Sequence, residues 1–267
     1  MLILLSLQHG RKKLFIIIPL CVLALCTVAL GIYYMIDGPG GMLTLFARVD
    51  RTDMMAQGQF NGLPCRVYAP EGLVRSYEQY PLVLYLHGAG QRGDNNRAQT
   101  RKNSVMQTLL NKENLAAYPC FVLAPQCPAN GWWEAEVLMG LLEEFRAEYP
   151  VDPARIYITG LSMGGYGTWA MLAAYPDYFA AAVPICGGGD PETAPLFKGV
   201  PIWAFHGAKD DVVLLGSSDE MIWALEAAGA HTKYTVYHTE KHRSWERAYR
   251  EPELFSWLFA QSKEVIA

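Results

Sequence analysis

The sequence has little of what a disulfide scaffold, a metalloprotein or a nucleic-acid-binding protein needs. It holds six cysteines among 267 residues, too few for a disulfide framework in a chain of this length. It contains neither a CxxC nor an HExxH motif, and no other Cys/His spacing is typical of a metal site. Its 22 basic residues are outnumbered by 26 acidic ones, and no basic cluster is typical of nucleic-acid binding. We therefore expect no metal and no nucleic-acid partner.

One long apolar run is present near the first residue. Residues 11–13 are basic, and the uncharged stretch 14–36 that follows is long enough to cross a bilayer as a helix. A cleaved signal peptide is the alternative, with its best cleavage site at residues 29–31. The apolar run continues through Ile36, which favours an uncleaved signal anchor over a signal peptide.

The basic residues before this run also predict its orientation, because such residues tend to stay in the cytoplasm. We expect a cytoplasmic tail over 1–13, a signal anchor over 14–36, a linker over 37–56 and an extracytoplasmic domain over 57–267. Secretion after cleavage is the alternative localisation. The membrane, reached through the N-terminal segment, is then a partner of the chain.

Strand and helix patterns alternate along the rest of the chain. The expected strands are 57–60, 65–68, 81–86, 120–124, 155–159, 180–185, 201–205 and 233–237, the first two joined as a hairpin by Asn61-Gly62. The expected helices end near Asn111, cover 134–149, follow residue 165 as far as 175, and cover 218–228 and 247–261. This alternation predicts an α/β fold with a mostly parallel sheet and helices on both of its faces.

The stretch around Ser162 carries the strongest functional signal. Residues 156–159 are typical of a buried strand, and Gly-Leu-Ser-Met-Gly over 160–164 matches the G-x-S-x-G pattern of a nucleophile elbow before a helix. A sharp turn that exposes the serine brings the residues two before and two after it too close for side chains, which explains Gly160 and Gly164. The pentapeptide also arises by chance as an ordinary glycine-rich turn. Its position between a strand and a helix favours a catalytic serine.

A serine nucleophile needs a base, and histidine is the residue type that serves. His87 and His206 each end a strand before a glycine, so we expect them to position turns. His238 and His242 lie in the loop after the last strand, where a side chain can meet Ser162. His242 lies further into that loop than His238 does.

The acid that orients the base must also lie at a strand end. Asp210 and Asp211 follow the strand that ends near His206, and only one of the two carboxylates can point at the histidine. Asp190, after the preceding strand, is a competitor. Each of the three is also a candidate turn or cap residue, as most loop aspartates are.

Several stretches together resemble the esterase branch of the α/β-hydrolase superfamily. More narrowly, the chain is similar to secreted phospholipase/carboxylesterase-like proteins, also called predicted peptidases, that are related to dienelactone hydrolase and feruloyl esterases. The resemblance covers roughly 57–260 and implies Ser162 as nucleophile, Asp210 as acid and His242 as base. The matching stretches are His87–Asn95 (HGAGQRGDN), Ala124–Pro128 (APQCP), Gly160–Gly165 (GLSMGG), His206–Val213 (HGAKDDVV) and His242–Trp245 (HRSW).

An oxyanion hole would complete such a site. The N–H of Met163 follows the nucleophile at a helix N-terminus, where unpaired amides favour developing negative charge. The second donor should come from the loop after the strand 81–86, and we choose Ala89 N–H, with Gly90 next. A dinucleotide phosphate cradle is the rival interpretation of these glycines, but the G-x-G-x-x-G spacing is absent.

We therefore expect a serine hydrolase that cleaves a small-molecule carboxylic ester through an acyl-enzyme, and the sequence implies no organic cofactor. The alternatives are a serine peptidase related to the prolyl oligopeptidase catalytic domain and a non-catalytic surface binding protein on the same fold. Trp132, Trp133 and Trp245 are candidates for pocket lining or for ordinary packing. Cys186 should lie near the site as a free thiol.

Overall fold

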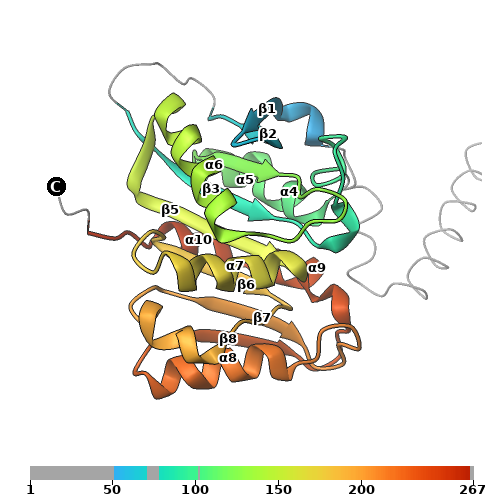
Figure 1. Ribbon diagram of the computed structural model, residues 1–267, viewed down its shortest axis with the longest axis vertical. Helices are drawn as coiled ribbons and strands as arrows, with labels where there is room; N and C mark the ends of the chain where they lie inside the picture. The colour runs from blue at the N-terminus through green and yellow to red at the C-terminus, as the bar shows by residue number, and fades with distance from the viewer. Residues whose placement is uncertain (1–50, 71–77, 102, 265–267) are drawn as a thin grey trace, which may run out of the picture. The chain divides into compact units, whose positions relative to one another are not determined.

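Eight strands form one sheet in the order β1-β2-β4-β3-β5-β6-β7-β8 (Figure 1). β1 pairs with β2, and β2 with β4, in antiparallel fashion, whereas all pairs from β4 to β8 are parallel. The mostly parallel sheet predicted from the alternating pattern is therefore present. The strands are β1 Ala56–Phe60, β2 Leu63–Tyr68, β3 Tyr80–Leu86, β4 Phe121–Pro125, β5 Val151–Leu161, β6 Ala181–Ile185, β7 Trp203–Gly207 and β8 Lys233–Tyr237.

This computed structural model describes residues 51–70, 78–101 and 103–264. The predicted tail 1–13, the predicted anchor 14–36 and most of the predicted linker 37–56 lie outside the described residues. Within the described ranges, no helix has both the length and the apolar character needed to cross a bilayer.

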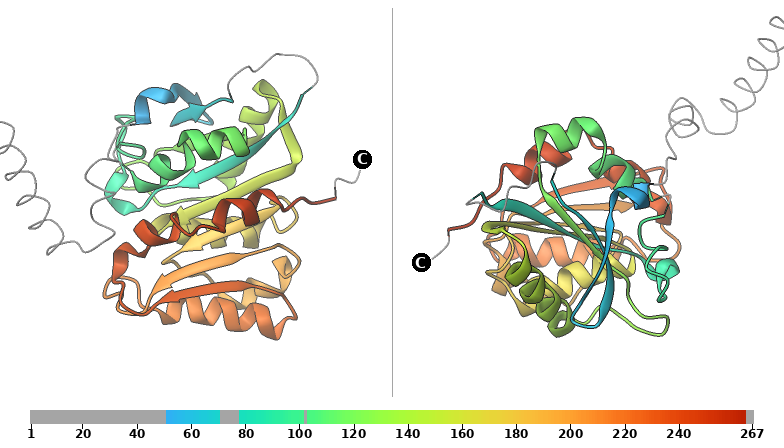
Figure 2. Two further views of the ribbon diagram at one scale, coloured as in Figure 1. Left: turned by 180° about the vertical axis from the view of Figure 1, so that it is seen from behind. Right: turned by 90° about the horizontal axis from the view of Figure 1, so that it is seen from above.

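Helices cover both faces of the sheet. The views from behind and from above show the two helical layers on opposite sides of the strands (Figure 2). One layer consists of α6 Ala135–Glu148, α7 Met163–Ala174 and α8 Gly216–Ala227, and the other of α4 Ser104–Leu109, α5 Lys112–Ala117, α9 Trp245–Ala248 and α10 Leu254–Phe259. Four short 3-10 helices complete the list: η1 Arg51–Met54, η2 Ala89–Gln91, η3 Pro191–Phe197 and η4 His242–Ser244.

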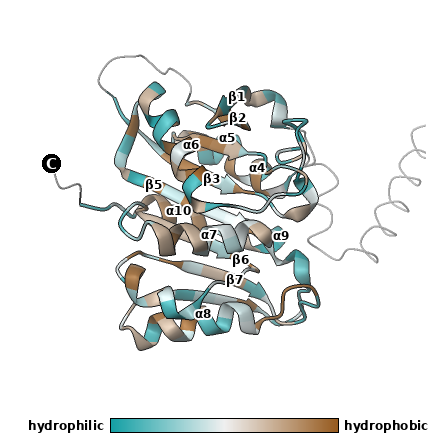
Figure 3. Ribbon diagram, viewed as in Figure 1, coloured by the Kyte–Doolittle hydropathy of each residue, from teal (hydrophilic) through white to brown (hydrophobic). Residues whose placement is uncertain are grey.

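The central strands are apolar at nearly every position because each face of the sheet has its own core. In β3, Leu82, Leu84 and Leu86 belong to the core beneath α6, α7 and α8, whereas Val83 and Tyr85 belong to the core beneath α4, α9 and α10. Alternate residues of a strand point to opposite faces, so a strand covered on both sides has no solvent-facing position. α7 is buried at most of its positions, whereas α8 carries both hydrophobic and hydrophilic residues along its length (Figure 3).

The predicted hairpin at the sheet edge is also present. Asn61 and Gly62 have φ values of 44° and 77°, and they join β1 to β2. Both central residues of a type I′ turn need positive φ, which is why Asn-Gly is such a strong hairpin signal.

Three predicted elements differ from the observed ones by more than a shift of one to three residues at their ends. β5 begins at Val151 and not at residue 155, with an irregularity in its pairing to β3 after Val151. The predicted helix 247–261 is interrupted, because Pro252 lies between α9 and α10 and a proline interrupts the helical hydrogen-bond ladder. The helix predicted to end at Asn111 is followed by a second one, α5, whose first turn is capped by Asn111 Oδ1 at 2.7 Å from Asn114 N.

Candidate active site

Ser162 lies at the turn between β5 and α7, with φ 54° and ψ −119°. This combination is strained for a residue with a Cβ atom, and Ser162 N donates to Ile185 O of the neighbouring strand at 3.0 Å. A Cβ atom at Gly160 would lie 2.2 Å from Gly164 O, and one at Gly164 would lie 2.0 Å from Leu86 O. The two glycines of the elbow are therefore required by close backbone contacts, as predicted.

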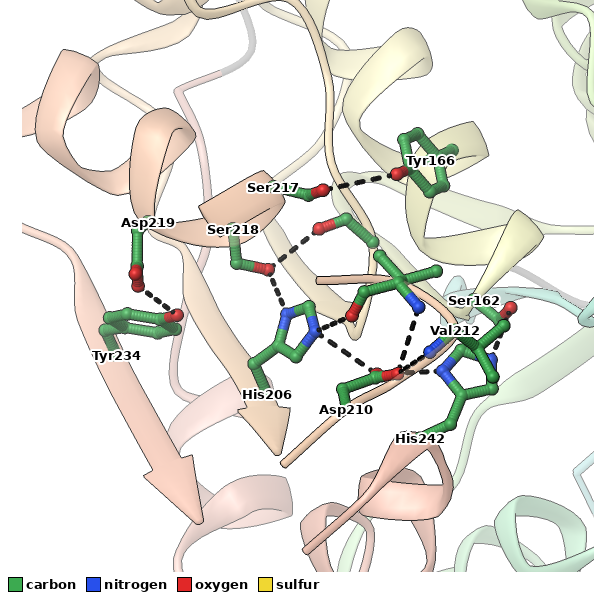
Figure 4. Close-up of polar contacts among 12 residues, drawn as sticks. Ser162, Tyr166, His206, Asp210, Val212, Ser217, Ser218, Asp219, Tyr234 and His242 are labelled. Carbon is green, nitrogen blue, oxygen red and sulfur yellow. Dashed lines mark hydrogen bonds and ion pairs between the residues drawn. The ribbon is translucent and has the colours of Figure 1, made fainter. Parts of the chain in front are cut away.

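The structure brings Ser162, His242 and Asp210 into one hydrogen-bonded line (Figure 4). Ser162 Oγ lies 3.0 Å from His242 Nε2, and His242 Nδ1 lies 2.8 Å from Asp210 Oδ2. The Asp210 side chain is fully buried, whereas that of His242 is 17% exposed. The line therefore runs from a buried carboxylate to a serine through a histidine that solvent can reach.

Backbone amides fix the carboxylate of Asp210. Its Oδ1 accepts from Val212 N and from Val213 N, each at 2.9 Å, and its own N–H donates to Gly207 O at 3.1 Å. Such an aspartate-centred turn leaves Oδ2 as the oxygen that can meet His242.

The competing aspartates and histidine lie elsewhere. Asp211 is exposed and pairs with Lys241 Nζ at 3.0 Å, and this lysine lowers the pKa of the Asp211 carboxyl. Asp190 caps η3, where its Oδ1 accepts from Glu192 N at 3.0 Å. His238 is exposed just after β8. Among the residues proposed as acid and base, His242 contacts Ser162 and Asp210 contacts His242.

The two candidate oxyanion donors, Met163 N–H and Ala89 N–H, come from the start of α7 and from the loop after β3. α7 begins at Met163, so the N–H of Met163 belongs to the first helical turn, where amides lack helical acceptors. A Cβ atom on Gly88 would lie 3.5 Å from the Cβ of Ser162, which places the loop after β3 against the serine. Ala89 follows in that loop as the first residue of η2.

His87 holds this loop in place. Its Nε2 lies 3.0 Å from Cys127 N, a donor, so Nδ1 carries the ring proton and donates to Gly88 O at 2.7 Å. Burial lowers the pKa of His87 to about 4, so the ring is neutral at physiological pH. Trp133 Nε1 donates to His87 O at 3.0 Å. The turn-positioning role predicted for His87 therefore extends to the segment before α6.

Cys186 is buried just after β6 and has an unusual φ of 40°. Its Sγ lies within 4.8 Å of ligand atoms of Asp210 and His242, and it is a free thiol, as predicted. Burial raises the pKa of this thiol to about 12, whereas metal ligation needs a thiolate, and Asp210 Oδ2 already bonds His242 Nδ1. The chemistry of the three donors therefore favours a packed thiol over a metal site.

The three tryptophans proposed as pocket lining have different surroundings. The ring of Trp245 packs edge-on against His242, with centroids 5.3 Å apart. Trp132 is 53% exposed and lies edge-on to Tyr166, a residue of α7 one turn after Ser162, at 6.1 Å between centroids. Trp133 is buried beneath the loop after β3. Trp245 thus contacts the proposed base, whereas Trp132 and Trp133 both line a cavity beside the segment before α6.

Comparison with known proteins agrees with this geometry. A solved thermostable esterase is 37% identical, with a TM-score of 0.74, over 79% of this chain and 64% of the esterase. The chain has the α/β-hydrolase fold. The resemblance inferred from its motifs is thereby confirmed, and the model of the prolyl oligopeptidase family matches residues 129–198, which include Ser162.

Two curated relatives of this α/β-hydrolase are larger proteins. Poly(3-hydroxyalkanoate) depolymerase C of Paucimonas lemoignei is 35% identical over 40% of this chain and 28% of the depolymerase. The bifunctional acetylxylan esterase/xylanase XynS20E of Neocallimastix patriciarum is 30% identical over 57% of this chain and 22% of that enzyme. The chain thus spans less than a third of the length of either relative.

Proposed function

We propose that this α/β-hydrolase is a serine hydrolase that cleaves carboxylic esters through an acyl-enzyme. The observation that carries the proposal is the line Ser162 Oγ–His242 Nε2–His242 Nδ1–Asp210 Oδ2, with steps of 3.0 and 2.8 Å across its two hydrogen bonds. A serine hydroxyl needs a base to take its proton, and the base needs an acid that fixes its tautomer. A protein that only binds ligands has no use for all three groups in this order.

Each group has a defined task in the proposed reaction. Ser162 Oγ attacks the ester carbonyl while its proton moves to His242 Nε2, and Asp210 stays ionised and stabilises the imidazolium. The N–H groups of Met163 and Ala89 receive the negative charge that forms on the carbonyl oxygen. His242 then returns the proton to the departing alkoxide, and a water molecule repeats the sequence to release the acid.

Esters are favoured over peptides by the names of the relatives. The solved structure at 37% identity and the relative at 30% are described as esterases, whereas the peptidase descriptions come from a family model that matches 129–198 and from solved structures at 16–18% identity. We therefore place a small carboxylic ester first. A serine peptidase is the second candidate, supported by that family match.

A substrate panel tests the choice. Aryl esters of increasing acyl length, a methyl feruloyl ester and a peptide anilide are offered to the full-length chain, with Ser162→Ala as the control. We expect turnover of esters that depends on Ser162, and no cleavage of the anilide. Cleavage of the anilide with kcat/KM comparable to that of the best ester would instead support the peptidase.

We also propose that residues 14–36 remain in the mature protein as a membrane anchor and hold the hydrolase outside the cytoplasm. The uncharged run that continues through Ile36, behind the basic residues 11–13, supports this arrangement. The full-length chain should resist extraction from membranes by alkaline carbonate. A soluble mature form that begins near Ile32 would contradict the proposal and support a cleaved signal peptide.

A further inference from the structure

A second histidine contacts the acid of the proposed triad from the side opposite His242. His206, in β7, is fully buried, and its Nε2 lies 3.3 Å from Asp210 Oδ2, the same oxygen that meets His242 Nδ1 at 2.8 Å. Figure 4 shows the two imidazole rings on either side of the carboxylate. The sequence predicted a turn-positioning role for His206, and nothing in its spacing indicates that it reaches the acid.

Both polar atoms that contact His206 Nε2 within the described residues are hydrogen-bond acceptors. Besides Asp210 Oδ2, the carbonyl oxygen of Val213 lies 2.9 Å from this nitrogen. A carbonyl and a carboxylate have no proton to give, so Nε2 must carry one. His206 Nε2 therefore donates to Val213 O, and the Asp210 carboxylate lies beside the same nitrogen at ion-pair distance.

The other ring nitrogen also faces an oxygen that cannot spare a proton. His206 Nδ1 lies 2.7 Å from Ser218 Oγ, in the first turn of α8. Ser218 Oγ in turn donates to Gly187 O at 2.8 Å, and a hydroxyl has a single proton. Gly187 O can only accept, so a Ser218 hydroxyl that donates to it accepts from His206, and Nδ1 is then a donor as well.

We propose that His206 is a positioning residue that meets Asp210 as an imidazolium, donating from both ring nitrogens. The inference rests on the proposed function, since Asp210 is the acid only if Ser162 and His242 act as nucleophile and base. A buried cation is tolerated where a carboxylate and several hydrogen bonds compensate for lost water, and His206 has both. The cation fixes the orientation of Asp210 and draws some of its negative charge away from His242.

Five titratable groups of the described residues lie around His206 and its hydrogen-bond partners. They come from the turn after β7, from the segment after β6, from η4, and from α8 and β8. They are Asp210, the Cys186 thiol, His242, Asp219 and Tyr234, the last two being bonded to each other at 2.7 Å. Asp210 is therefore the carboxylate that balances the charge proposed for His206.

The contrast with His87 supports this assignment. His87 is equally buried and also precedes a glycine, but its Nε2 faces the N–H of Cys127, a donor. A nitrogen that accepts from an N–H cannot carry a proton, so His87 is neutral. The two histidines are distinguished by what faces their ring nitrogens and not by their burial.

The first experiment measures the protons of His206 directly. In the full-length chain labelled with [¹⁵N]histidine, two-dimensional ¹⁵N–¹H spectra at pH 7 report both ring nitrogens, with His206→Gln used to assign the signals. We expect two protonated nitrogens for His206 and one for His87. A lone pair on either nitrogen of His206 would overturn the proposal. This measurement needs no substrate, so it holds even if no ester is ever cleaved.

The second experiment uses two variants that differ in reach. His206→Gln keeps a donor at the position of Nε2 without the charge, whereas the shorter His206→Asn leaves Asp210 without this partner. Loss of a partner that orients a metal-ligating side chain typically costs about 10- to 100-fold, and we take the same range for the partner of Asp210. We expect kcat on the best ester to fall by that factor in His206→Asn, with KM unchanged, and to recover most of the loss in His206→Gln. Equal loss in both variants would contradict a donor role.

The pH profile separates an electrostatic role from simple support of the loop. Without the cation, Asp210 keeps its full negative charge for His242 and stabilises the protonated, inactive base. The acidic limb of kcat/KM should therefore move to higher pH in His206→Gln, by on the order of one pH unit. A limb that stays in place or moves to lower pH would overturn the proposal. The exposed His238→Gln variant is the control and should keep the wild-type profile.

Discussion

Two buried His-Gly pairs end strands on opposite sides of Ser162. His87-Gly88 ends β3 and supports the loop of the proposed oxyanion hole, and His206-Gly207 ends β7 and supports the turn of the proposed acid. Sequence and burial are alike at the two places. The hydrogen-bond partners are opposite, because the first ring meets a backbone donor and the second meets acceptors. The His-Gly pair thus predicts the position of each histidine at a strand end. The hydrogen-bond partners of the ring determine its protonation state and therefore its role.

The largest loss of activity should follow a change of the proposed acid, Asp210, in the turn after β7. Asp210→Asn keeps the shape but favours the wrong tautomer of His242, and the corresponding change in a serine protease costs about 10⁴ in kcat. We expect ester kcat to fall by about three to four orders of magnitude on folded protein. Asp211→Asn and Asp190→Asn are matched controls, because neither carboxylate is hydrogen-bonded to His242. Asp211 forms an exposed ion pair with Lys241, and Asp190 caps η3. Each control should cost less than about tenfold. If Asp190→Asn lost most of its ester kcat while Asp210→Asn kept most of it, the acid would lie after β6 and not after β7.

The neutral state of His87 can be tested through stability. Its folded pKa of about 4 lies below the unfolded value of 6.5, so the unfolded chain binds a proton that the folded chain does not. The stabilising contribution is present above pH 6.5 and is lost as the pH falls towards 4. Between pH 7 and 4 the wild type should lose about 2 to 3 kcal/mol more unfolding free energy than His87→Gln does.

Urea unfolding at the two pH values provides the measurement for His87. The exposed His238→Gln variant should follow the wild type across the same range. If the wild type and His87→Gln lose stability in parallel, His87 is not held neutral, and the contrast with His206 disappears.

The glycines of the two pairs should also differ in tolerance. A Cβ atom on Gly207 would lie 2.5 Å from the backbone oxygens of Glu240 and Lys241, the segment that leads into His242. A Cβ atom on Gly88 would lie 2.9 Å from Cδ1 of Leu161, the end of a side chain that can rotate. We expect Gly207→Ala to lower the unfolding free energy by about 1 to 3 kcal/mol, and Gly88→Ala by less. Equal losses in urea titrations would show that the two strand ends are packed alike.

Local signals account for what the sequence predicted well. Asn61-Gly62 requires no information beyond a two-residue hairpin, and Gly160 and Gly164 follow from the geometry of one sharp turn. The break at Pro252 has an equally local signal, since a proline interrupts a helix, and so does the start of α5 at its Asn111 cap. These two elements could have been predicted from the same rules.

The role of His206 could not have been predicted in that way. Its partners are Asp210 and Val213 in a turn, and Ser218 in the following helix, and their atoms converge only when the chain closes around β7. Cys186 was predicted near the site from its position after a strand, but its φ of 40° and the approach of its sulfur to Asp210 depend on tertiary structure. The direction of a hydrogen bond depends on which groups meet in the folded chain. The sequence can therefore identify such residues as candidates but cannot predict which of their atoms carry protons.

The most direct test of the central proposal asks whether Ser162 is an activated nucleophile. The full-length chain, shown to be folded by its circular dichroism spectrum, is treated with a fluorophosphonate probe, digested and analysed by mass spectrometry. We expect a single labelled peptide with the probe on Ser162, no labelling of Ser162→Ala, and slow labelling of Asp210→Asn. A folded wild-type chain that takes up no probe, or a probe attached to another serine, would contradict the proposal.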